Sequence, residues 1–309
     1  MSVLLACDVG ADEAAQWRAA LGAALPGERL VGTREGADDI DVAIVANPPP
    51  GALTGLPRLR LIQSLWAGVD RLLADPTVPA QVPIVRMVDP LMNAAMAETA
   101  LWAVLALHRG FFRYARWQRE ARWAPHGQRR AQEVTVAVLG LGQMGRAVAL
   151  RLAAQGYRVL GWSTRPAAAG GIETQAGDTA LDALLARADV VLNLLPLTAA
   201  TRGLFDAARF GRMKQGAGFV NLARGAHVVE ADLLAALDGG LLHHAVLDVF
   251  QTEPLPADHR FWSHPRVTVL PHAAAQTDPR SAAGIVADNL RALREGRPLA
   301  HLVDRARGY

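Results

Sequence analysis

Short runs of aliphatic and β-branched residues alternate with helical segments along nearly the whole chain. In the first third these strand-like runs cover residues 3–7, 41–47, 59–65 and 83–87. After a break the alternation restarts, with runs at residues 134–140, 157–163, 189–195, 216–223, 243–250 and 266–272. Regular alternation of this kind predicts α/β architecture, in which parallel sheets are covered by helices on both faces. Two such series predict two sheets.

A segment rich in Ala, Met and Leu separates the two series. It runs from Leu91 to about Trp117, contains no proline, and has Gly110 as its single glycine. Residues of this kind favour helix, so the segment is predicted to be one long helix that carries the chain from one domain into the next. A last helix is predicted near residues 279–295, and the tail after it can return to the first domain.

Composition excludes several classes of function. The net charge is only +3 and Lys214 is the sole lysine, so the high pI of about 9.6 reflects dispersed arginines without a basic stripe for nucleic acid. A lone cysteine, Cys7, cannot form a disulfide within the chain, which favours a reducing, cytoplasmic location. The acidic start lacks the basic region of a signal peptide, and no uninterrupted apolar run of about 18 residues predicts a membrane span.

A glycine-rich turn follows the first strand of the second series. Gly140, Gly142 and Gly145 form a G-x-G-x-x-G string directly between a strand and a helix, with Gln143 and Met144 inside it. The first glycine permits a tight turn, the second lets backbone approach a pyrophosphate, and the third lets helix and strand pack closely. The alternative is an ordinary glycine-rich turn, but this placement favours dinucleotide binding.

The end of the next strand indicates which dinucleotide is preferred. NAD sites usually carry an acidic residue there to bind the ribose 2′-hydroxyl, whereas this chain has Ser163, Thr164 and Arg165. A guanidinium can bind a 2′-phosphate through paired, charge-assisted hydrogen bonds. The sequence therefore predicts a preference for NADP(H), with NAD(H) as the alternative.

Three polar residues follow strands of the second series. Arg224 comes after residues 216–223, Glu253 after 243–250, and His272 ends the run 266–272. Ligands of open α/β sheets bind at the carboxyl ends of the strands. There, Arg224 can bind a carboxylate, and His272 can protonate a carbonyl oxygen with Glu253 as its partner. This chemistry requires no metal, although His259 and His264 lie nearby in sequence and compete for the acid role.

Motifs in a fixed order extend this interpretation to nearly the whole chain. They are SLWAGVDRL (64–72), MAETALWAVLALHR (96–109), VLGLGQMGRAVA (138–149), GWSTRP (161–166), NLLPLTAATRGL (193–204), NLARGAHVVE (221–230), LDVFQTEPLP (247–256), PHAAAQT (271–277) and VDRARGY (303–309). Together they resemble the D-isomer-specific 2-hydroxyacid dehydrogenases, and within that family the branch that reduces small 2-keto acids such as glyoxylate and hydroxypyruvate.

The resemblance implies a Rossmann cofactor domain, residues 99–278, inserted into a flavodoxin-like substrate domain, residues 1–98 plus 279–309, with the active site in the cleft between them. It implies that Arg224, Glu253 and His272 are catalytic, and that Trp66, Ala67 and Gly68 join Arg224 in holding the substrate. The cofactor contacts it implies are at Leu195, Pro196, Thr201, Ala223 and Asp248, besides the turn and strand-end residues named above. The resemblance also implies a homodimer formed through the cofactor domain. The apolar helix near 91–109 can supply the contact, or it can simply be buried between the two domains of one chain.

Two other functions stay open at this stage. One is a dinucleotide-sensing binding protein, because corepressors of the same family keep the catalytic residues. The other is a Rossmann methyltransferase, which would leave Arg224, Glu253 and His272 unexplained. Turnover of NADPH with glyoxylate separates the reductase from both, and a related dehydrogenase with a different substrate remains a further alternative.

Overall fold

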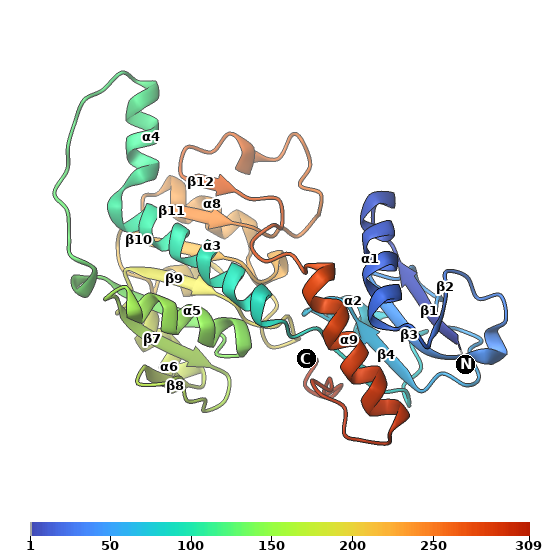
Figure 1. Ribbon diagram of the computed structural model, residues 1–309. Coiled ribbons are helices and arrows are strands. Elements are labelled where there is room, and N and C mark those ends of the chain that lie inside the picture. The colour runs from blue at the N-terminus through green and yellow to red at the C-terminus, as the bar shows by residue number, and fades with distance from the viewer. Residues whose placement is uncertain (1) are drawn as a thin grey trace. The chain divides into compact units, whose positions relative to one another are not determined.

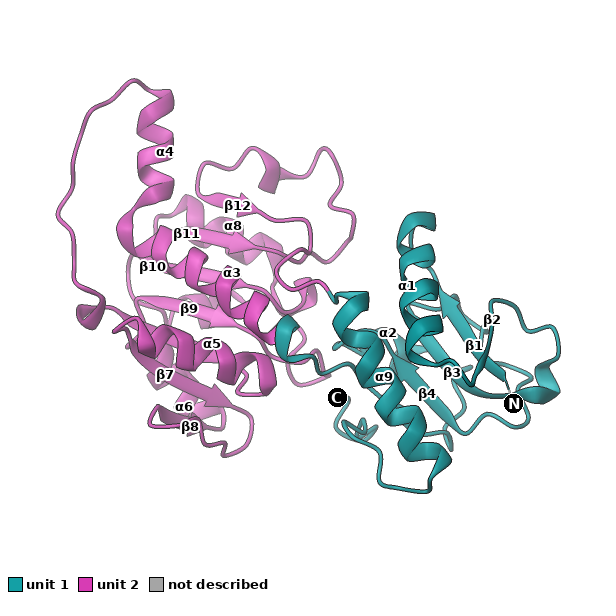
Figure 2. Cartoon of the chain, in the orientation of Figure 1, with its two compact units in different colours: residues 1–92, 277–309 teal, residues 93–276 magenta. Residues whose placement is uncertain are grey.

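The computed structural model describes residues 2–309, which form two compact units (Figure 1). Unit 1 comprises residues 1–92 and 277–309, and unit 2 comprises residues 93–276 (Figure 2). The boundaries fall a few residues before those expected from the sequence, at 98/99 and 278/279. Each unit is built on a sheet whose strands are all parallel, so the predicted fold class, two α/β parallel-sheet domains, is confirmed.

Unit 1 contains a five-stranded sheet in the order β2-β1-β3-β4-β5. Its strands are β1 Ser2–Cys7, β2 Arg29–Val31, β3 Ile40–Ala46, β4 Leu61–Ser64 and β5 Ile84–Val85. Its helices are α1 Ala11–Ala24, α2 Asp70–Ala74 and α9 Pro279–Arg294, with a 3-10 turn at Ala37–Asp39. The central strand β3 is buried along its whole length, which is why its sequence, IDVAIVA, is apolar at every position except Asp41.

The last helix, α9, belongs to unit 1 although 184 residues of unit 2 separate it from the first part of that unit (93–276). It packs against α1, and the side-chain amide of Asn289 donates to Gln63 on β4 at 2.9 Å. Arg294 binds Glu28 at 2.9 Å and also pairs with the buried Asp41. The tail then returns along β5, where the Val303 N–H donates to the Ile84 carbonyl at 2.8 Å. The predicted return of the tail is confirmed.

Unit 2 contains a seven-stranded sheet in the order β12-β11-β10-β9-β6-β7-β8. Its strands are β6 Thr135–Leu139, β7 Arg158–Ser163, β8 Glu173–Ala176, β9 Val190–Asn193, β10 Ala217–Asn221, β11 Leu242–Leu247 and β12 Val267–Val269. Its helices are α3 Pro90–Arg109 (which begins in unit 1), α4 Phe111–Arg119, α5 Gln143–Ala154, α6 Asp178–Leu185, α7 Ala207–Phe210 and α8 Glu230–Asp238. Three 3-10 turns complete it, at Ala131–Glu133, Gly225–His227 and Arg260–Trp262.

Each of the six strand-like runs predicted in this half corresponds to one strand, with β11 beginning one residue before its run, whereas β8 was not predicted. It is a polar edge strand, ETQA, that is only partly buried, so it lacks the apolar pattern on which the prediction relied.

The prediction of one long helix over residues 91–117 is wrong. The helix ends at Arg109, and Gly110 adopts a left-handed conformation (φ 71°) before α4 begins. Glycine takes this conformation at no steric cost, which is why helices so often end beside one. Of the helices in residues 2–309, α3 is the one long and apolar enough to cross a membrane, but Ala100, Val104 and Leu107 lie in the core of unit 2. Figure 1 shows α4 projecting from the rest of unit 2, with an extended segment returning from it.

Candidate active site

The predicted catalytic residues of unit 2 lie on segments that leave the same edge of its sheet. Because β10, β11 and β12 are parallel neighbours, their carboxyl ends share that edge. Arg224 follows β10, Glu253 follows β11, and His272 follows β12. A backbone hydrogen bond of 2.8 Å from the His272 N–H to the Asp248 carbonyl joins the second and third of these segments.

Glu253 and His272 form a hydrogen-bonded pair. The imidazole Nδ1 lies 2.8 Å from Glu253 Oε2, which leaves Nε2 available for a substrate. The other oxygen, Oε1, accepts the backbone N–H of Phe250 at 2.9 Å. Burial raises the pKa of Glu253, but the hydrogen bonds from His272 and Phe250 outweigh it and bring the pKa below its ordinary value. Glu253 is therefore an ionised carboxylate that orients the imidazole ring through Nδ1.

Asp248 fixes the segment that carries His272. One carboxylate oxygen accepts the Ala273 N–H at 2.7 Å, and the other accepts the Ala274 N–H at 3.0 Å. These bonds hold His272 at φ 53°, a conformation that non-glycine residues seldom adopt. Burial raises the pKa of Asp248, although the two backbone N–H groups oppose that effect. The sequence predicted a cofactor contact for Asp248 but did not predict this role in positioning His272.

Arg224 lies on a loop whose shape depends on the next residue. The guanidinium donates to the carbonyl of Ala223 at 2.7 Å. A Cβ on Gly225 would lie 1.9 Å from the carbonyl carbon of Phe250, so the two backbones are in direct contact there. Only glycine allows this approach, and it brings the Arg224 loop against the segment that leads to Glu253.

The glycine-rich turn has the geometry that a dinucleotide phosphate requires. Gly140 adopts φ 97°, and a Cβ on Gly145 would lie 1.6 Å from the Gly140 carbonyl oxygen. In contrast, a Cβ on Gly142 would meet no described atom within 4 Å, so this glycine borders open space. α5 begins at Gln143, directly after Gly142, and the first N–H groups of a helix lack intrahelical acceptors, so they can donate to an anion. These residues fit a bound pyrophosphate.

The strand-end residues predicted to read the ribose lie beside this turn. β7 pairs with β6, and the Gly140 N–H donates to the Trp162 carbonyl at 2.8 Å. The Ser163 hydroxyl bonds to the Arg165 carbonyl, while Thr164 and Arg165 are exposed. Within residues 2–309 the Arg165 guanidinium has no acidic partner, so it is available to an anionic ligand.

The loop after β9 carries three further predicted cofactor residues. Thr201 is buried, and its hydroxyl donates to the Pro196 carbonyl at 2.7 Å and accepts the Thr198 N–H at 2.9 Å. Leu195 is buried, with its N–H on Asn193 Oδ1. Thr201 therefore holds the loop in shape from within. Ala223, on the next loop, is likewise tied through its N–H to Asn221.

In unit 1, the predicted substrate loop begins at the carboxyl end of β4. The Trp66 N–H bonds to the Ser64 hydroxyl at 3.0 Å, and its ring packs edge-to-face on the buried Trp17 of α1, with centroids 6.2 Å apart. The N–H groups of Ala67 and Gly68 have no acceptor in the described part of the chain. They are free donors, as a carboxylate-binding loop requires.

The histidines that competed for the acid role are engaged elsewhere. His259 Nε2 lies 3.3 Å from Glu230, and His264 Nε2 lies 3.0 Å from Asp238. His243 and His244 point to different surroundings, as expected of neighbours on a strand, and the buried His244 stacks on Phe112.

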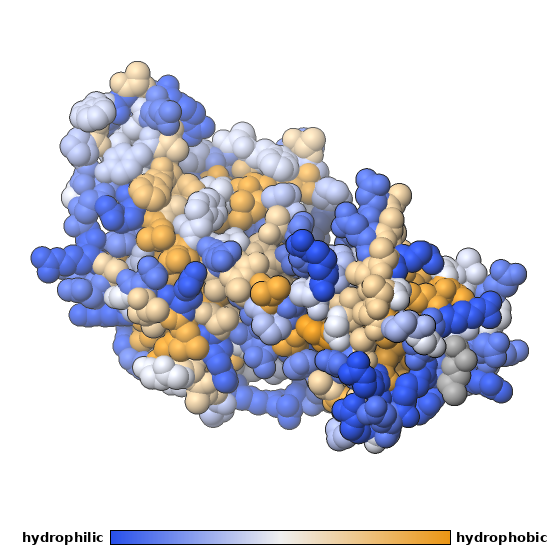
Figure 3. Space-filling model, in the orientation of Figure 1, coloured by the Kyte–Doolittle hydropathy of each residue, from blue (hydrophilic) through white to orange (hydrophobic). Residues whose placement is uncertain are grey.

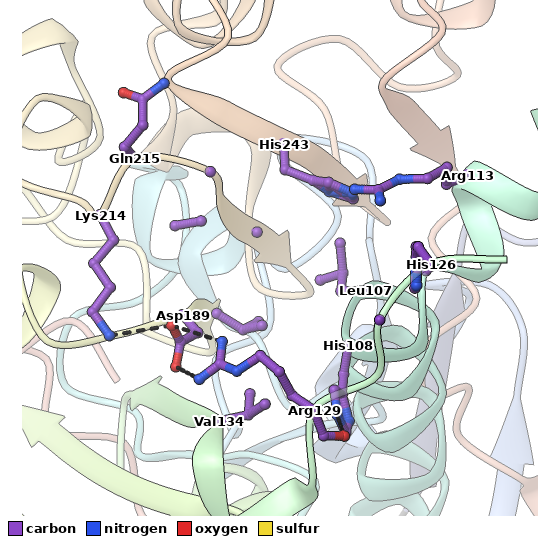
Figure 4. Close-up of a pocket in the computed structure, with 16 residues that line it drawn as sticks. Leu107, His108, Arg113, His126, Arg129, Val134, Asp189, Lys214, Gln215 and His243 are labelled. Carbon is purple, nitrogen blue, oxygen red and sulfur yellow. Dashed lines mark hydrogen bonds and ion pairs between the residues drawn. The ribbon is translucent and has the colours of Figure 1, made fainter. Parts of the chain in front are cut away.

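The opposite edge of the sheet holds a cavity of about 410 Å³ (Figure 4). It lies at the amino ends of β9, β10 and β11, beneath α4 and the segment that returns from it. Its central acid, Asp189, accepts from Lys214 at 3.1 Å, from Arg129 at 3.2 Å and from the Thr135 N–H at 2.8 Å. Arg129 and Lys214 are thus already paired, and Asp189 ties the base of the projecting segment to the sheet.

Comparison with known proteins places this site in a family. The family model described as "D-isomer specific 2-hydroxyacid dehydrogenase, NAD binding domain" matches residues 101–274. A glyoxylate/hydroxypyruvate reductase A from Serratia proteamaculans is 40% identical over 302 residues, covering 96% of each chain. The enzyme of the same name from Yersinia enterocolitica is 39% identical over 303 residues, covering 96% of this chain and 97% of its own.

Solved structures agree with this assignment. A D-isomer specific 2-hydroxyacid dehydrogenase from Xanthobacter autotrophicus, in complex with NADPH and MES, has a TM-score of 0.95 at 40% identity, over 100% of this chain and 99% of that one. An NADPH-dependent glyoxylate/hydroxypyruvate reductase from Sinorhizobium meliloti, with NADP and sulfate, has a TM-score of 0.93 at 36% identity, over 100% of both chains. The chain therefore belongs to the D-isomer specific 2-hydroxyacid dehydrogenase family and is an NAD(P)-dependent oxidoreductase.

Proposed function

We propose that this protein uses NADPH to reduce small 2-keto acids, glyoxylate and hydroxypyruvate above all, to 2-hydroxy acids. The observation that carries the proposal is the His272–Glu253 pair, 2.8 Å apart, at the sheet edge from which the Arg224 loop also leaves. Names of relatives at about 40% identity supply the substrate class. Cytoplasmic location fits the lone free cysteine, Cys7.

In this mechanism the protein binds the substrate and supplies one proton. Arg224 holds the carboxylate with paired hydrogen bonds, and the Ala67 and Gly68 N–H groups of unit 1 remain the predicted further donors. When bound, NADPH would supply the hydride that C2 receives. His272 Nε2 donates its proton to the carbonyl oxygen, which becomes the hydroxyl, while the Glu253 carboxylate holds the ring through Nδ1. Trp66, rigidly packed on Trp17, is proposed to restrict the pocket to short keto acids.

A steady-state comparison tests this function. NADPH oxidation is measured with glyoxylate, hydroxypyruvate, pyruvate and a longer 2-keto acid, and each is repeated with NADH. The proposal expects the highest kcat/KM for one of the first two substrates with NADPH. No turnover with either would remove the proposed substrate class while leaving the family assignment intact.

The preference for NADPH is proposed to depend on Arg165. This arginine is exposed and without an acidic partner in residues 2–309, and solved relatives contain NADPH or NADP. A charge-assisted contact to the 2′-phosphate contributes roughly tenfold or more in affinity, and Pro166 adds no second cation. Arg165→Ala should therefore raise KM for NADPH about tenfold and leave KM for NADH nearly unchanged. Equal losses for both cofactors would show that Arg165 does not read the 2′-phosphate.

We further propose a homodimer formed through unit 2. One face of α3 packs in the core of unit 2. Its outer face carries Trp102, which is 42% exposed, and α4 begins with Phe111, which is 53% exposed. Figure 3 shows apolar residues on this outer face among hydrophilic ones. Trp123, on the segment that returns from α4, is 98% exposed. Tryptophan and phenylalanine are enriched at protein interfaces relative to the rest of the surface, so these exposed aromatic side chains of unit 2 are the proposed contacts of the dimer.

Sedimentation measures this assembly directly. The wild-type protein is expected at twice 32.9 kDa at micromolar concentration, and the double variant Phe111→Ser, Trp123→Ser should shift it toward the monomer. Leu150→Ser, which changes a 42% exposed residue on α5, serves as the matched control. A wild-type monomer under these conditions would contradict the proposal.

A further inference from the structure

Three polar side chains lie completely buried behind the Arg224 loop. Asn193 ends β9, Asn221 ends β10, and His227 lies in the 3-10 turn Gly225–His227; all three are 0% exposed. The reaction described above uses none of them. Burying polar groups costs free energy unless each donor and acceptor is satisfied, so the bonds they make define what they hold.

Both the nitrogen and the oxygen of the Asn193 side-chain amide form hydrogen bonds. Its amide nitrogen donates to Asn221 Oδ1 at 3.0 Å and to His227 Nδ1 at 2.9 Å. Its oxygen accepts the N–H of Leu195, the first of the predicted cofactor residues on the next loop, at 3.2 Å. Asn193 thus connects the cofactor-side loop to both other members of the network.

Asn221 connects the network to the substrate arginine. Its amide nitrogen donates to the backbone carbonyl of Arg224 at 2.9 Å, and its oxygen accepts the Ala223 N–H at 3.2 Å. The same Arg224 carbonyl also accepts the His227 backbone N–H at 3.3 Å. The backbone from which the Arg224 guanidinium extends is therefore held by two donors from the network.

His227 completes the connection with both ring nitrogens. Because the Asn193 amide donates to Nδ1, that nitrogen must be an acceptor, and the proton lies on Nε2. Nε2–H then points to the Pro196 carbonyl at 3.3 Å. Pro196 is on the same loop as Thr201, whose hydroxyl donates to the same carbonyl. One neutral imidazole thereby joins the loop that carries the predicted cofactor residues to the asparagines that hold Arg224.

We propose that His227 is a positioning residue which sets the cofactor loop through Nε2 and the substrate arginine through Nδ1. The proposal rests on the proposed function for the roles of Arg224 and of the loop 194–201. It differs from simple support of the fold because the two ring nitrogens serve different ligands. Loss of the Nε2 bond should therefore weaken cofactor binding. Loss of the Nδ1 bond should weaken substrate binding, because the amide nitrogen of Asn193 also bonds to Asn221, whereas its oxygen keeps the separate bond to the Leu195 N–H.

Two substitutions separate the nitrogens. The side-chain oxygen of asparagine lies near the place of Nδ1, so His227→Asn keeps the acceptor for Asn193 but cannot reach Pro196. The amide nitrogen of glutamine lies near the place of Nε2, so His227→Gln can still donate to Pro196 but leaves Asn193 without its acceptor. Loss of one neutral hydrogen bond typically changes an equilibrium about three- to tenfold.

The measurements are the Kd for NADPH, from fluorescence titration, and the KM for glyoxylate at saturating NADPH. His227→Asn should raise the NADPH Kd about three- to tenfold and leave the glyoxylate KM within about twofold; His227→Gln should do the reverse. His244→Asn and His244→Gln are matched controls, since His244 is a buried histidine of the same unit bound to Thr268 at 2.9 Å. They should lower Tm without separating the two constants.

The proposal is overturned if both His227 variants raise the two constants together, or if neither constant changes in either variant. A wild-type protein that does not reduce glyoxylate would instead contradict the proposed function. In that case calorimetric binding of oxamate, a non-reducible 2-keto acid mimic, to the protein–NADP⁺ complex replaces KM. The two His227 variants must then have opposite effects on the binding of NADPH and of oxamate. Failure of this inference and failure of the proposed function therefore remain distinguishable.

Discussion

Replacing His272 by alanine is expected to lower kcat for keto-acid reduction by about 10²- to 10⁴-fold, the usual contribution of general acid catalysis. The ring is 2.8 Å from Glu253 through Nδ1, so alanine removes both the proton donor and the partner of that carboxylate. Asp248 still holds the Ala273 and Ala274 N–H groups, so the loop keeps its shape. The Kd for NADPH should therefore stay within about twofold, which fluorescence titration measures.

His259→Ala is the matched control. It removes a histidine–carboxylate pair of the same unit, with Glu230 at 3.3 Å, that the proposed reaction does not use. Its kcat should match that of the wild type. If His272→Ala kept more than about a third of wild-type kcat, some other group would be donating the proton, and the assignment of His272 as the acid would fail.

Arg224→Lys is expected to lower kcat/KM for glyoxylate by about 10- to 150-fold although the charge is kept. Lysine offers a point charge in place of the planar fork that matches a carboxylate. The loop itself should survive, because Asn221 and the His227 N–H bind the backbone carbonyl at this position and not the side chain. The affinity for NADPH should change much less than kcat/KM.

Arg187→Lys provides the comparison, because Arg187 forms a solvent-exposed pair with Glu173 at the far edge of the sheet. It should leave every kinetic constant near the wild-type value. Equal losses of keto-acid and NADPH affinity in Arg224→Lys would mean that Arg224 serves the cofactor or the fold, and its role as the substrate anchor would be rejected.

Buried parallel strands were the part of the fold that the sequence predicted best. Strands covered on both faces are apolar at nearly every position, so the runs at residues 41–47 and 134–140, in which Asp41, Asn47 and Thr135 are the exceptions, are easily recognised in the sequence. The short edge strands Arg29–Val31 and Glu173–Ala176 lack that requirement and were not predicted. The break at Gly110 was not predicted either, since an isolated glycine inside a helical pattern can be tolerated and does not by itself show where the helix ends.

The residues of the candidate site were also predicted only in part. His272, Glu253 and Arg224 could be proposed because polar residues after strand ends carry recognisable chemistry. The network behind them was missed, because its meaning lies in contacts between segments far apart in sequence, such as Asn193 with His227 at 2.9 Å. One signal was available in the sequence, because Asn193 and Asn221 each interrupt an apolar strand run. A polar side chain in a buried strand usually has a hydrogen-bond partner, so each asparagine indicated a contact.

The discontinuity of unit 1 has a consequence for how the chain acquires its structure during synthesis. Ribosomes release residues 1–92 first, yet α9, which packs on α1 and bonds to β4 and Asp41, is made only after all of unit 2. Domains generally fold in the order in which they emerge. Here that order is reversed, because residues 93–276 are contiguous and can close their own core while the earlier residues still lack α9. The nascent chain must therefore keep the apolar surface of α1 and β4 from aggregating for the whole time that unit 2 is being translated.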